Sequence, residues 1–267
     1  MKINQKTIIV TGAGSGIGRA LSKELIAKGA IVVGVDLHES ALLETKSLLG
    51  QKGSQFYLEV LNISDKQAVQ NFPKLLKAKN LVIDGLINNA GIIQPFVKIN
   101  ELSEEDMERV MQVNFYGAWH LTKAFLPNFL QRPEAHIVNI SSMGGFLPFP
   151  GQAIYGASKA AVKLFTEGLY AELLPTNVRV TVIFPGAVST NITQNSGLEM
   201  PSTSQGNTAN FPMENPDVVA QKIVRAMEKN TFSLCIGKDS RMMNILYRMS
   251  PGFATRLIAK KMASLLK

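Results

Sequence analysis

Seven short runs rich in β-branched residues recur along this chain, and helical stretches fall between most of them. The predicted strands cover residues 7–12, 30–36, 55–62, 82–89, 136–141, 178–186 and 232–237. Predicted helices include residues 19–28, 104–130, 152–174 and 215–229. Strands that alternate with helices form a parallel sheet covered on both faces, because crossover connections are right-handed. We therefore expect the α/β class, with a single doubly wound, Rossmann-like domain and a C-terminal helical extension.

The composition supports a folded interior and limits the class of protein. Hydrophobic residues make up 46% of the 267 residues and charged residues 18%, which suits a globular core. Cys235 is the single cysteine, so no internal disulfide is expected, and no paired Cys/His cluster suggests a metal site. The N-terminus lacks the features of a signal peptide, and no apolar run approaches the roughly 20 residues of a membrane span. Together these features indicate a cytoplasmic protein.

The net charge of +8 is concentrated in one part of the chain. Residues 222–267 carry ten of the 28 Lys and Arg residues, but only two of the 20 Asp and Glu residues. The preceding residues are balanced in charge. We therefore expect no nucleic-acid-binding function, which would call for a more uniformly basic chain.

A glycine-rich turn, TGAGSGIG, joins the first predicted strand to the first predicted helix. Gly12, Gly16 and Gly18 permit a tight turn and a close approach of the backbone to a ligand. The helix that follows offers free N–H groups and the positive end of its dipole, which together can bind a pyrophosphate. The strand before the turn and the helix after it make this interpretation stronger than the glycines alone would.

Asp36 ends the second predicted strand, 18 residues after Gly18. A carboxylate at this position can bind both hydroxyls of an adenosine ribose, and it repels a 2′-phosphate. Neither Leu37 nor His38 is an Arg or Lys, and residue 15 is a serine. We therefore expect NAD as the cofactor, with NADP as the alternative. The competing interpretation of Asp36 is a turn residue at the end of a strand.

Tyr155 and Lys159 stand four residues apart in AIYGASKAA, a stretch that favours helix. Positions i and i+4 share one face of a helix, so both side chains are expected to point the same way. An ammonium beside a phenol lowers the pKa of the phenol. Tyr155 could then exchange a proton with an alcohol or a ketone near neutral pH. The alternative is that both side chains lie on the surface of an amphipathic helix.

Five motifs follow one another along the chain: TGAGSGIG, NNAG at residues 88–91, a serine at position 142, YGASK at residues 155–159 and Pro-Gly at residues 185–186. In this order and spacing they resemble the short-chain dehydrogenase/reductase family. The resemblance covers residues 5–237. It implies an NAD-binding catalytic domain over residues 1–240, with residues 241–267 as a basic amphipathic extension rather than an independent domain.

The resemblance implies a role for four catalytic residues. Tyr155 resembles the proton-transferring tyrosine, and Lys159 resembles the lysine that lowers the tyrosine pKa and holds the nicotinamide ribose. Ser142 resembles the serine that hydrogen-bonds the reacting oxygen and stabilises charge there. Asn114 resembles the helix asparagine that supports a water relay to the lysine; without the resemblance it would be taken as a residue that bonds its local backbone.

The resemblance also implies which residues bind the cofactor. They are Gly12, Ser15, Gly16, Ile17, Gly18, Asp36, Asn62, Ile63, Asn88, Asn89, Ala90, Gly91, Tyr155, Lys159, Pro185, Gly186, Val188 and Thr190. Asn62 and Ile63 stand where the family commonly has Asp-Val beside the adenine. An asparagine can still make an amide contact there.

The activity implied is the interconversion of an alcohol and a ketone or aldehyde by hydride transfer, with matched proton transfer at Tyr155. The segment GGFLPFPGQ, residues 144–152, has no Arg or Lys that could bind a carboxylate or a phosphate. Phe146, Leu147 and Phe149 therefore predict a small apolar substrate, unless they pack against helices or a neighbouring subunit. Residues 191–215 are rich in Ser, Thr, Asn, Gly and Pro, and they form a candidate substrate lid.

The extension has an apolar stripe at helical spacing with basic residues beside it. The stripe contains Phe253, Leu257, Ile258, Met262, Leu265 and Leu266, and the basic residues are Arg256, Lys260 and Lys261. We expect this helix to pack on the domain or on another subunit. The alternative is a weak contact with an anionic membrane surface, which would make the protein membrane-peripheral.

Three functional classes follow from these features. An NAD-dependent oxidoreductase is favoured. A non-catalytic nucleotide-binding regulator could use the same fold, and a membrane-peripheral dehydrogenase of lipid-type substrates could use the basic helix. The resemblance further implies a homodimer or homotetramer, formed through the helices that carry Asn114 and Tyr155.

Overall fold

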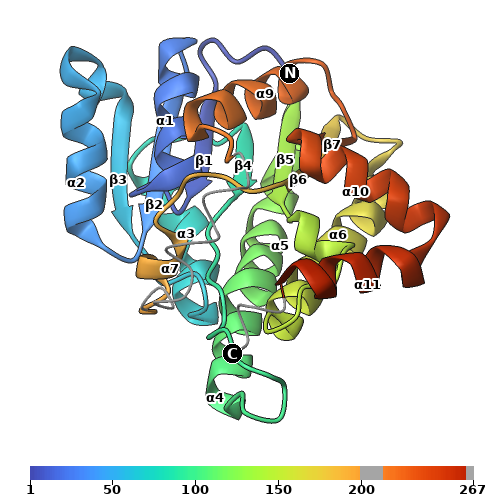
Figure 1. Cartoon of the computed structure of the whole chain (residues 1–267). Coiled ribbons are helices and arrows are strands. Elements are labelled where there is room, and N and C mark those ends of the chain that lie inside the picture. The colour runs from blue at the N-terminus through green and yellow to red at the C-terminus, as the bar shows by residue number, and fades with distance from the viewer. Residues whose placement is uncertain (199–212, 263–267) are drawn as a thin grey trace.

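The computed structural model describes residues 1–198 and 213–262. A seven-stranded sheet in the order β3-β2-β1-β4-β5-β6-β7 forms its centre (Figure 1). Its strands are β1 (Thr7–Thr11), β2 (Ile31–Asp36), β3 (Phe56–Val60), β4 (Gly85–Asn88), β5 (Ala135–Ile140), β6 (Val178–Pro185) and β7 (Ser233–Ile236). Every neighbouring pair is parallel. The expected doubly wound, Rossmann-like α/β fold is therefore confirmed.

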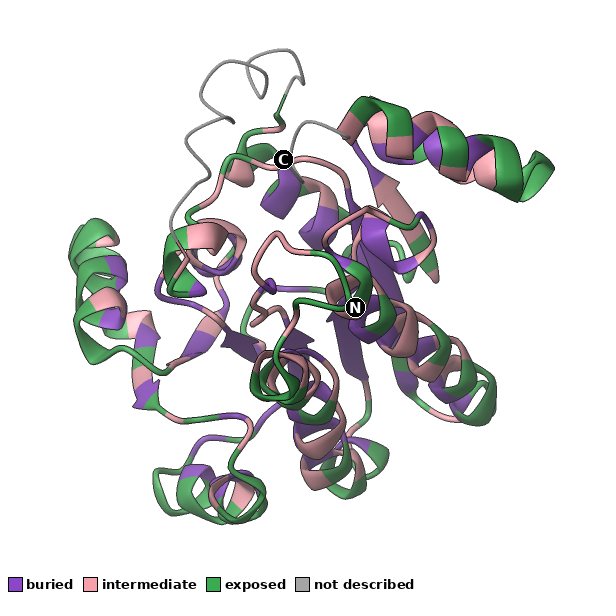
Figure 2. Ribbon diagram, turned by 60° about the horizontal axis from the view of Figure 1, so that its bottom comes forward, coloured by how far each residue is buried: buried purple, intermediate pink, exposed green. Residues whose placement is uncertain are grey.

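Helices cover both faces of the sheet and leave its strands largely buried (Figure 2). They are α1 (Gly16–Ala27), α2 (Glu39–Leu48), α3 (Lys66–Ala78), α4 (Glu104–Met111), α5 (Gly117–Leu130), α6 (Ala153–Leu173), α7 (Ile192–Asn195), α9 (Pro216–Glu228), α10 (Lys238–Met249) and α11 (Pro251–Met262), with the short turns η1 (Gly50–Gln55), η2 (Gln112–Tyr116) and η3 (Met143–Gly145). Successive residues of β1 point to opposite faces. Ile8 and Val10 pack with α1 and α9, whereas Ile9 packs with α3, α5 and α6. Burial on both faces explains why β1 is a continuous apolar run.

The position of β1 between β2 and β4 creates a crevice at the carboxyl ends of the strands. The order of the strands reverses at this point, so the connections that follow β1 and β4 diverge. The glycine-rich turn follows β1 and the NNAG turn follows β4. Asn89 Nδ2 donates a hydrogen bond of 2.9 Å to the carbonyl oxygen of Thr11, which joins the two turns.

The predicted helix over residues 104–130 is divided into three parts in the structure. The π-helical turn η2 separates α4 from α5. Asn114 lies within η2 and is buried. A π-turn inserts an extra residue into the helix, redirects the side chains near it and often occurs at a functional site. The apolar spacing continues through this turn, which is why the sequence predicts one helix.

The C-terminal helices α10 and α11 pack on the segment that contains η3. A buried cluster joins the two parts, formed by Leu147, Met243, Ala254 and Ile258. Phe146 and Phe149 pack against this cluster. The structure therefore supports the expected packing of the extension on the domain, and for residues 146–149 it supports the alternative of packing against helices. Phe253, which the sequence places on the packed face, is instead 51% exposed.

Several predicted features lie partly beyond the described residues. Of the candidate lid at residues 191–215, residues 199–212 lie outside them, as do Leu265 and Leu266 of the apolar stripe. The predicted boundary between residues 240 and 241 falls within the continuous helix α10. Of the helices in the described ranges, none has both the length and the hydrophobicity needed to cross a membrane.

Leu147→Ala tests whether the extension is an integral part of the domain. Leu147 is 0% exposed beneath the C-terminal helices, so its truncation should lower the free energy of unfolding by about 2–4 kcal/mol. Leu43→Ala on α2 is the matched control, since Leu43 is 53% exposed and its truncation should cost about 0.5 kcal/mol or less. Urea unfolding followed by circular dichroism measures both. Equal losses in the two variants would show that the extension is not packed as described.

Candidate active site

A groove of about 460 Å³ crosses the carboxyl ends of the central strands. Most of the predicted site residues line it: Gly12, Ser15, Gly16, Ile17, Asp36, Asn62, Ile63, Asn89, Ala90, Gly91, Ser142, Tyr155, Lys159, Pro185, Gly186, Val188 and Thr190. Gly18, Asn88 and Asn114 are not among its lining residues. Asn88 is buried and its amide bonds Thr122 and Asn139 instead, so it holds elements together beneath the groove.

The glycine-rich turn forms one wall of the groove. Gly12 and Gly16 have φ angles of +67° and +49°, in the left-handed region that favours glycine. A Cβ atom at Gly18 would overlap the carbonyl oxygen of Gly12, so only glycine lets α1 approach the turn this closely. Ser15 is the N-cap of α1 but makes no side-chain capping bond, which leaves the first N–H groups of the helix for a ligand. This cradle fits the pyrophosphate of a dinucleotide.

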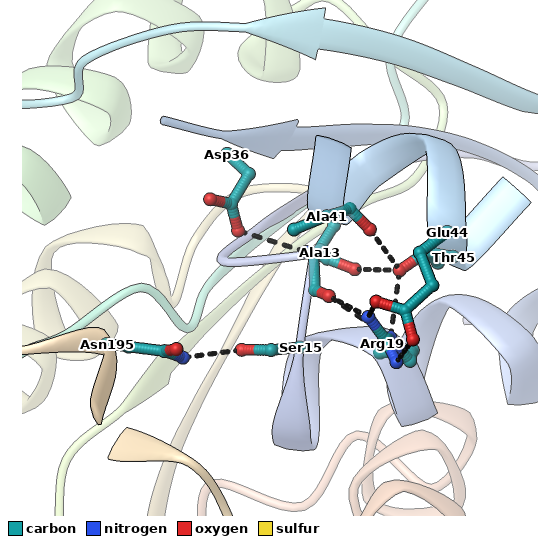
Figure 3. Close-up of polar contacts among 9 residues, drawn as sticks. Ala13, Ser15, Arg19, Asp36, Ala41, Glu44, Thr45 and Asn195 are labelled. Atoms are coloured by element: carbon teal, nitrogen blue, oxygen red, sulfur yellow. Dashed lines mark hydrogen bonds and ion pairs between the residues drawn. The ribbon is translucent and has the colours of Figure 1, made fainter. Parts of the chain in front are cut away.

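Asp36 reaches from the end of β2 to this turn (Figure 3). Its Oδ2 accepts a hydrogen bond of 3.0 Å from the backbone N–H of Gly14, and its Oδ1 accepts one of 3.1 Å from His38. The carboxylate is thereby held at the groove, where it fits the hydroxyls of a ribose.

Arg19 lies behind the turn and was not predicted to contribute to the site. Its guanidinium bonds the carbonyl oxygen of Gly14 and forms an ion pair with Glu44, with an N–O distance of 2.6 Å (Figure 3). The hydrogen bond from Arg19 holds the pKa of Glu44 below its usual value. Arg19, the cation drawn beside the glycine-rich turn in Figure 3, is therefore already paired with an anion.

The other end of the groove holds Ser142, Tyr155 and Lys159 together. Tyr155 and Lys159 both face the groove from α6, as their spacing predicts. Lys159 is 4% exposed, and its Nζ donates a hydrogen bond of 3.0 Å to the carbonyl oxygen of Ile140.

The predicted lowering of the Tyr155 pKa is not seen in the protein alone. Burial raises the pKa of Tyr155, and the hydrogen bond with Ser142 lowers it only in part. Burial also lowers the pKa of Lys159 from 10.5 to about 8. Each shift disfavours the charged form, because Lys159 is buried and Tyr155 is partly buried. The spacing shows that the two groups are neighbours, but it does not show how deeply they are buried.

Asn114 connects η2 to the loop that follows β4. Its Oδ1 accepts a hydrogen bond of 2.8 Å from the N–H of Ile92, and its Nδ2 donates to the carbonyl oxygen of Ile92 and to Ser158. A Cβ atom at Gly91 would lie 3.2 Å from Asn114 Oδ1 and 3.1 Å from Lys159 Nζ. Asn114 is thus beside Lys159, although it does not line the groove.

Two further residues that sequence reasoning missed support the site. Thr11 Oγ1 accepts hydrogen bonds from the N–H groups of Asn89 and Ala90. Gln94 Oε1 accepts bonds of 2.8 and 3.0 Å from the N–H groups of Ile154 and Tyr155, which caps the first turn of α6. Thr11 belongs to the quoted turn motif and could have been found there. Gln94 carries no local signal, because its partners lie 60 residues away.

The described start of the candidate lid closes one side of the groove. Asn195 Nδ2 donates a hydrogen bond of 2.7 Å to Ser15 Oγ (Figure 3). Ser196 Oγ accepts one of 3.0 Å from the N–H of Ile93. The segment around α7 therefore contacts both the glycine-rich turn and the loop after β4.

Comparison with known proteins identifies the family. The model of the short-chain dehydrogenase family matches residues 6–200. This chain belongs to the short-chain dehydrogenase/reductase family. SadH of Mycobacterium tuberculosis, which is named as an oxidoreductase, is 32% identical over 264 residues, or 97% of this chain and 95% of SadH.

Solved structures of the family contain either nicotinamide cofactor. A short-chain dehydrogenase/reductase from Burkholderia phymatum in complex with NAD aligns with a TM-score of 0.85 and 28% identity, covering 95% of this chain and 96% of that chain. The closed form of serine dehydrogenase complexed with NADP⁺ aligns with a TM-score of 0.76 and 29% identity, covering 85% of this chain and 94% of that chain. The chain is thus an oxidoreductase-family member whose fold binds nicotinamide dinucleotides in relatives.

Gly18→Ala tests the cradle. The new methyl group would collide with the backbone of Gly12, so the turn must shift, and the dissociation constant for NADH should rise about tenfold or more. Gly168→Ala on α6 is the matched control, because nothing lies within 4 Å of its added Cβ and the helix should gain up to about 1 kcal/mol. Fluorescence titration with NADH measures both. Unchanged binding in Gly18→Ala would contradict the assignment of this turn.

Lys159→Met tests the burial of the ammonium through pH. Between pH 8 and 10.5 the unfolded chain binds more protons at Lys159 than the folded protein, so the stability of the wild type should rise with pH. Lys159→Met lacks this rise. Its stability relative to wild type should therefore fall by about 2 kcal/mol from pH 7 to pH 10, measured by urea unfolding. Lys163→Met on the same helix is the control, since Lys163 is partly exposed beside Glu167. The same dependence of stability on pH in both variants would show that burial does not lower the pKa of Lys159.

Proposed function

We propose that this protein is an NAD-dependent oxidoreductase that interconverts an alcohol and a ketone or aldehyde. One observation carries the proposal: Ser142, Tyr155 and Lys159 line the same continuous groove as the glycine-rich cradle and Asp36. A dinucleotide held at one end would place its reactive part toward the other end. The intact set also argues against the regulator alternative, which needs only the nucleotide-binding part.

In this proposal the protein holds the substrate oxygen and moves one proton. A bound nicotinamide cofactor supplies the hydride acceptor or donor. Ser142 hydrogen-bonds the reacting oxygen, and Tyr155 gives it a proton during reduction or takes one during oxidation. Because burial keeps Tyr155 protonated in the protein alone, proton donation needs no prior ionisation, whereas oxidation requires Lys159 to stabilise the phenolate.

The preference for NAD rests on the charges at the adenosine end of the groove. The Asp36 carboxylate is fixed there by two backbone N–H groups and would repel a 2′-phosphate. Arg19, which could otherwise attract such a phosphate, is paired with Glu44. Both features support NAD over NADP.

The substrate proposed is a small apolar alcohol or carbonyl compound. Support comes from Ile92 and Ile192 in the groove, since Phe146 and Phe149 pack toward the extension instead of lining it. Lys159 is the single Lys or Arg among the lining residues in the described part of the chain, so no second cation is placed there to bind a carboxylate. The lid role of residues 191–215 remains a proposal, supported by the contacts of Asn195 and Ser196.

Assembly and location also remain proposals. A homodimer or homotetramer is supported by Tyr116 of η2 and Leu164 of α6, which are 39% and 69% exposed. A cytoplasmic location rests on the sequence alone. The membrane-peripheral alternative is supported by the exposed Met242, Ile245 and Met249 of α10, but α10 and α11 direct their buried face at the domain.

Turnover tests the proposed function. Absorbance at 340 nm should report oxidation or reduction across a panel of apolar alcohols and ketones, with NAD(H) preferred over NADP(H). Tyr155→Phe should lose about 100-fold or more in kcat while still binding NADH. Tyr170→Phe, which removes a hydroxyl elsewhere on α6, should keep wild-type turnover.

Either of two results would count against this assignment. Turnover by Tyr155→Phe at the wild-type rate would remove the acid–base role. A higher kcat/KM with NADPH than with NADH would overturn the cofactor preference drawn from Asp36.

A further inference from the structure

The first turn of α10 is anchored to a wall of the groove. Asp239 Oδ2 accepts a hydrogen bond of 2.9 Å from the N–H of Ala187, which lines the groove together with Gly186. The next residue, Ser240, is 0% exposed and donates a bond of 2.9 Å from its Oγ to the carbonyl oxygen of Phe184. Two successive side chains at the start of α10 therefore hold the end of β6 and the turn that follows it.

Three further backbone groups of this turn bond neighbouring segments. The N–H of Gly186 bonds the carbonyl oxygen of Ile236 at 2.8 Å. The carbonyl of Ala187 and the N–H of Ser189 both bond the backbone of Glu214, at 2.9 and 3.1 Å. Asp239 accepts from the N–H of Ala187, which lies between the bonded groups of Gly186 and Ser189. Loss of its carboxylate would leave this donor unpaired in a partly buried segment, which is costly.

The fit around the carboxylate is close on both sides. A Cβ atom at Gly186 would overlap the oxygens of Asp239, and so would a Cβ atom at Gly237, whose φ of +101° already favours glycine. The N-cap of α10 is Gly237, which has no side chain to cap the helix, and the Asp239 carboxylate bonds Ala187 outside the helix. The carboxylate of Asp239 therefore stabilises the turn after β6.

We propose that Asp239 is a positioning residue that fixes residues 185–188 in the conformation that receives the nicotinamide half of the cofactor. The proposal rests on the proposed function, because it assigns the nicotinamide half to the end of the groove near Tyr155. It makes the first turn of α10 a support of the cofactor site. Asp239 acts through the backbone of Ala187 and does not itself line the groove.

Two ligands separate this role from a purely structural one. NADH occupies both halves of the groove, whereas AMP occupies only the adenosine half near Asp36. Asp239→Ala should raise the dissociation constant for NADH about tenfold, as expected for the loss of a charge-assisted hydrogen bond, and leave that for AMP unchanged. A general loss of folding would instead weaken the binding of both ligands.

Two variants control for charge and for helix stability. Asp239→Asn keeps an oxygen that can accept from Ala187, so its NADH affinity should stay within about threefold of the wild type. Glu104→Ala removes an exposed carboxylate from the first turn of α4, a helix that contributes no residue to the groove lining, and it should change neither affinity. Calorimetric titration of the four full-length proteins measures every value.

The outcomes are distinct. Selective loss of NADH affinity in Asp239→Ala, with recovery in Asp239→Asn, supports the role. If Asp239→Ala weakens the binding of NADH and AMP equally, or weakens neither, the role of Asp239 is overturned and the proposed function stays intact. Absence of NADH binding by the wild type would overturn the proposed function, and with it any positioning of that cofactor.

Discussion

The pairing of β1 with β2 on one side and β4 on the other is the constraint on which the groove depends. Thr11 stands opposite Val35, and Val10 stands opposite Ile87, so the three strands end at one edge of the sheet. The glycine-rich turn, Asp36 and the NNAG turn each lie within a few residues of those ends. Sheet register, rather than the conformation of any long loop, therefore sets their separation, and rigid elements hold binding groups more accurately than loops do.

At the catalytic end of the same groove, burial makes the charged forms of two catalytic side chains less stable. In the proposed oxidation Tyr155 and Lys159 act through their charged forms, yet burial favours the neutral form of each. The Lys159 ammonium donates a hydrogen bond to the carbonyl oxygen of Ile140, and the Tyr155 hydroxyl is hydrogen-bonded with Ser142. In such a poorly hydrated site an interaction with a bound ligand is stronger than it would be in water. The ionisation that the reaction needs thus depends on what fills the groove, which spacing along one helix cannot show.

The sequence predicts the features that depend on residues close together in the chain. Alternating apolar runs and helices predict the seven strands and their parallel pairing, and short motifs predict the residues that line the groove. The features that it misses depend on partners far along the chain. Gln94 caps α6 from 60 residues away, Asp239 holds Ala187 from 52 residues away, and the π-turn around Asn114 preserves the apolar spacing of a regular helix.

The apolar stripe of the extension predicts that one face of the helix is buried, but it does not predict which part of the protein covers that face. The structure places this face on the segment around Leu147. Asp239 is the single acidic residue between residues 238 and 262, and its carboxylate is directed inward to Ala187. Arg248 of α10 and Arg256 of α11 are exposed, whereas the Asp239 carboxylate is used inside the domain. Like charges repel, so a symmetric contact that brought these arginines together in two copies of the protein would be opposed by their charge.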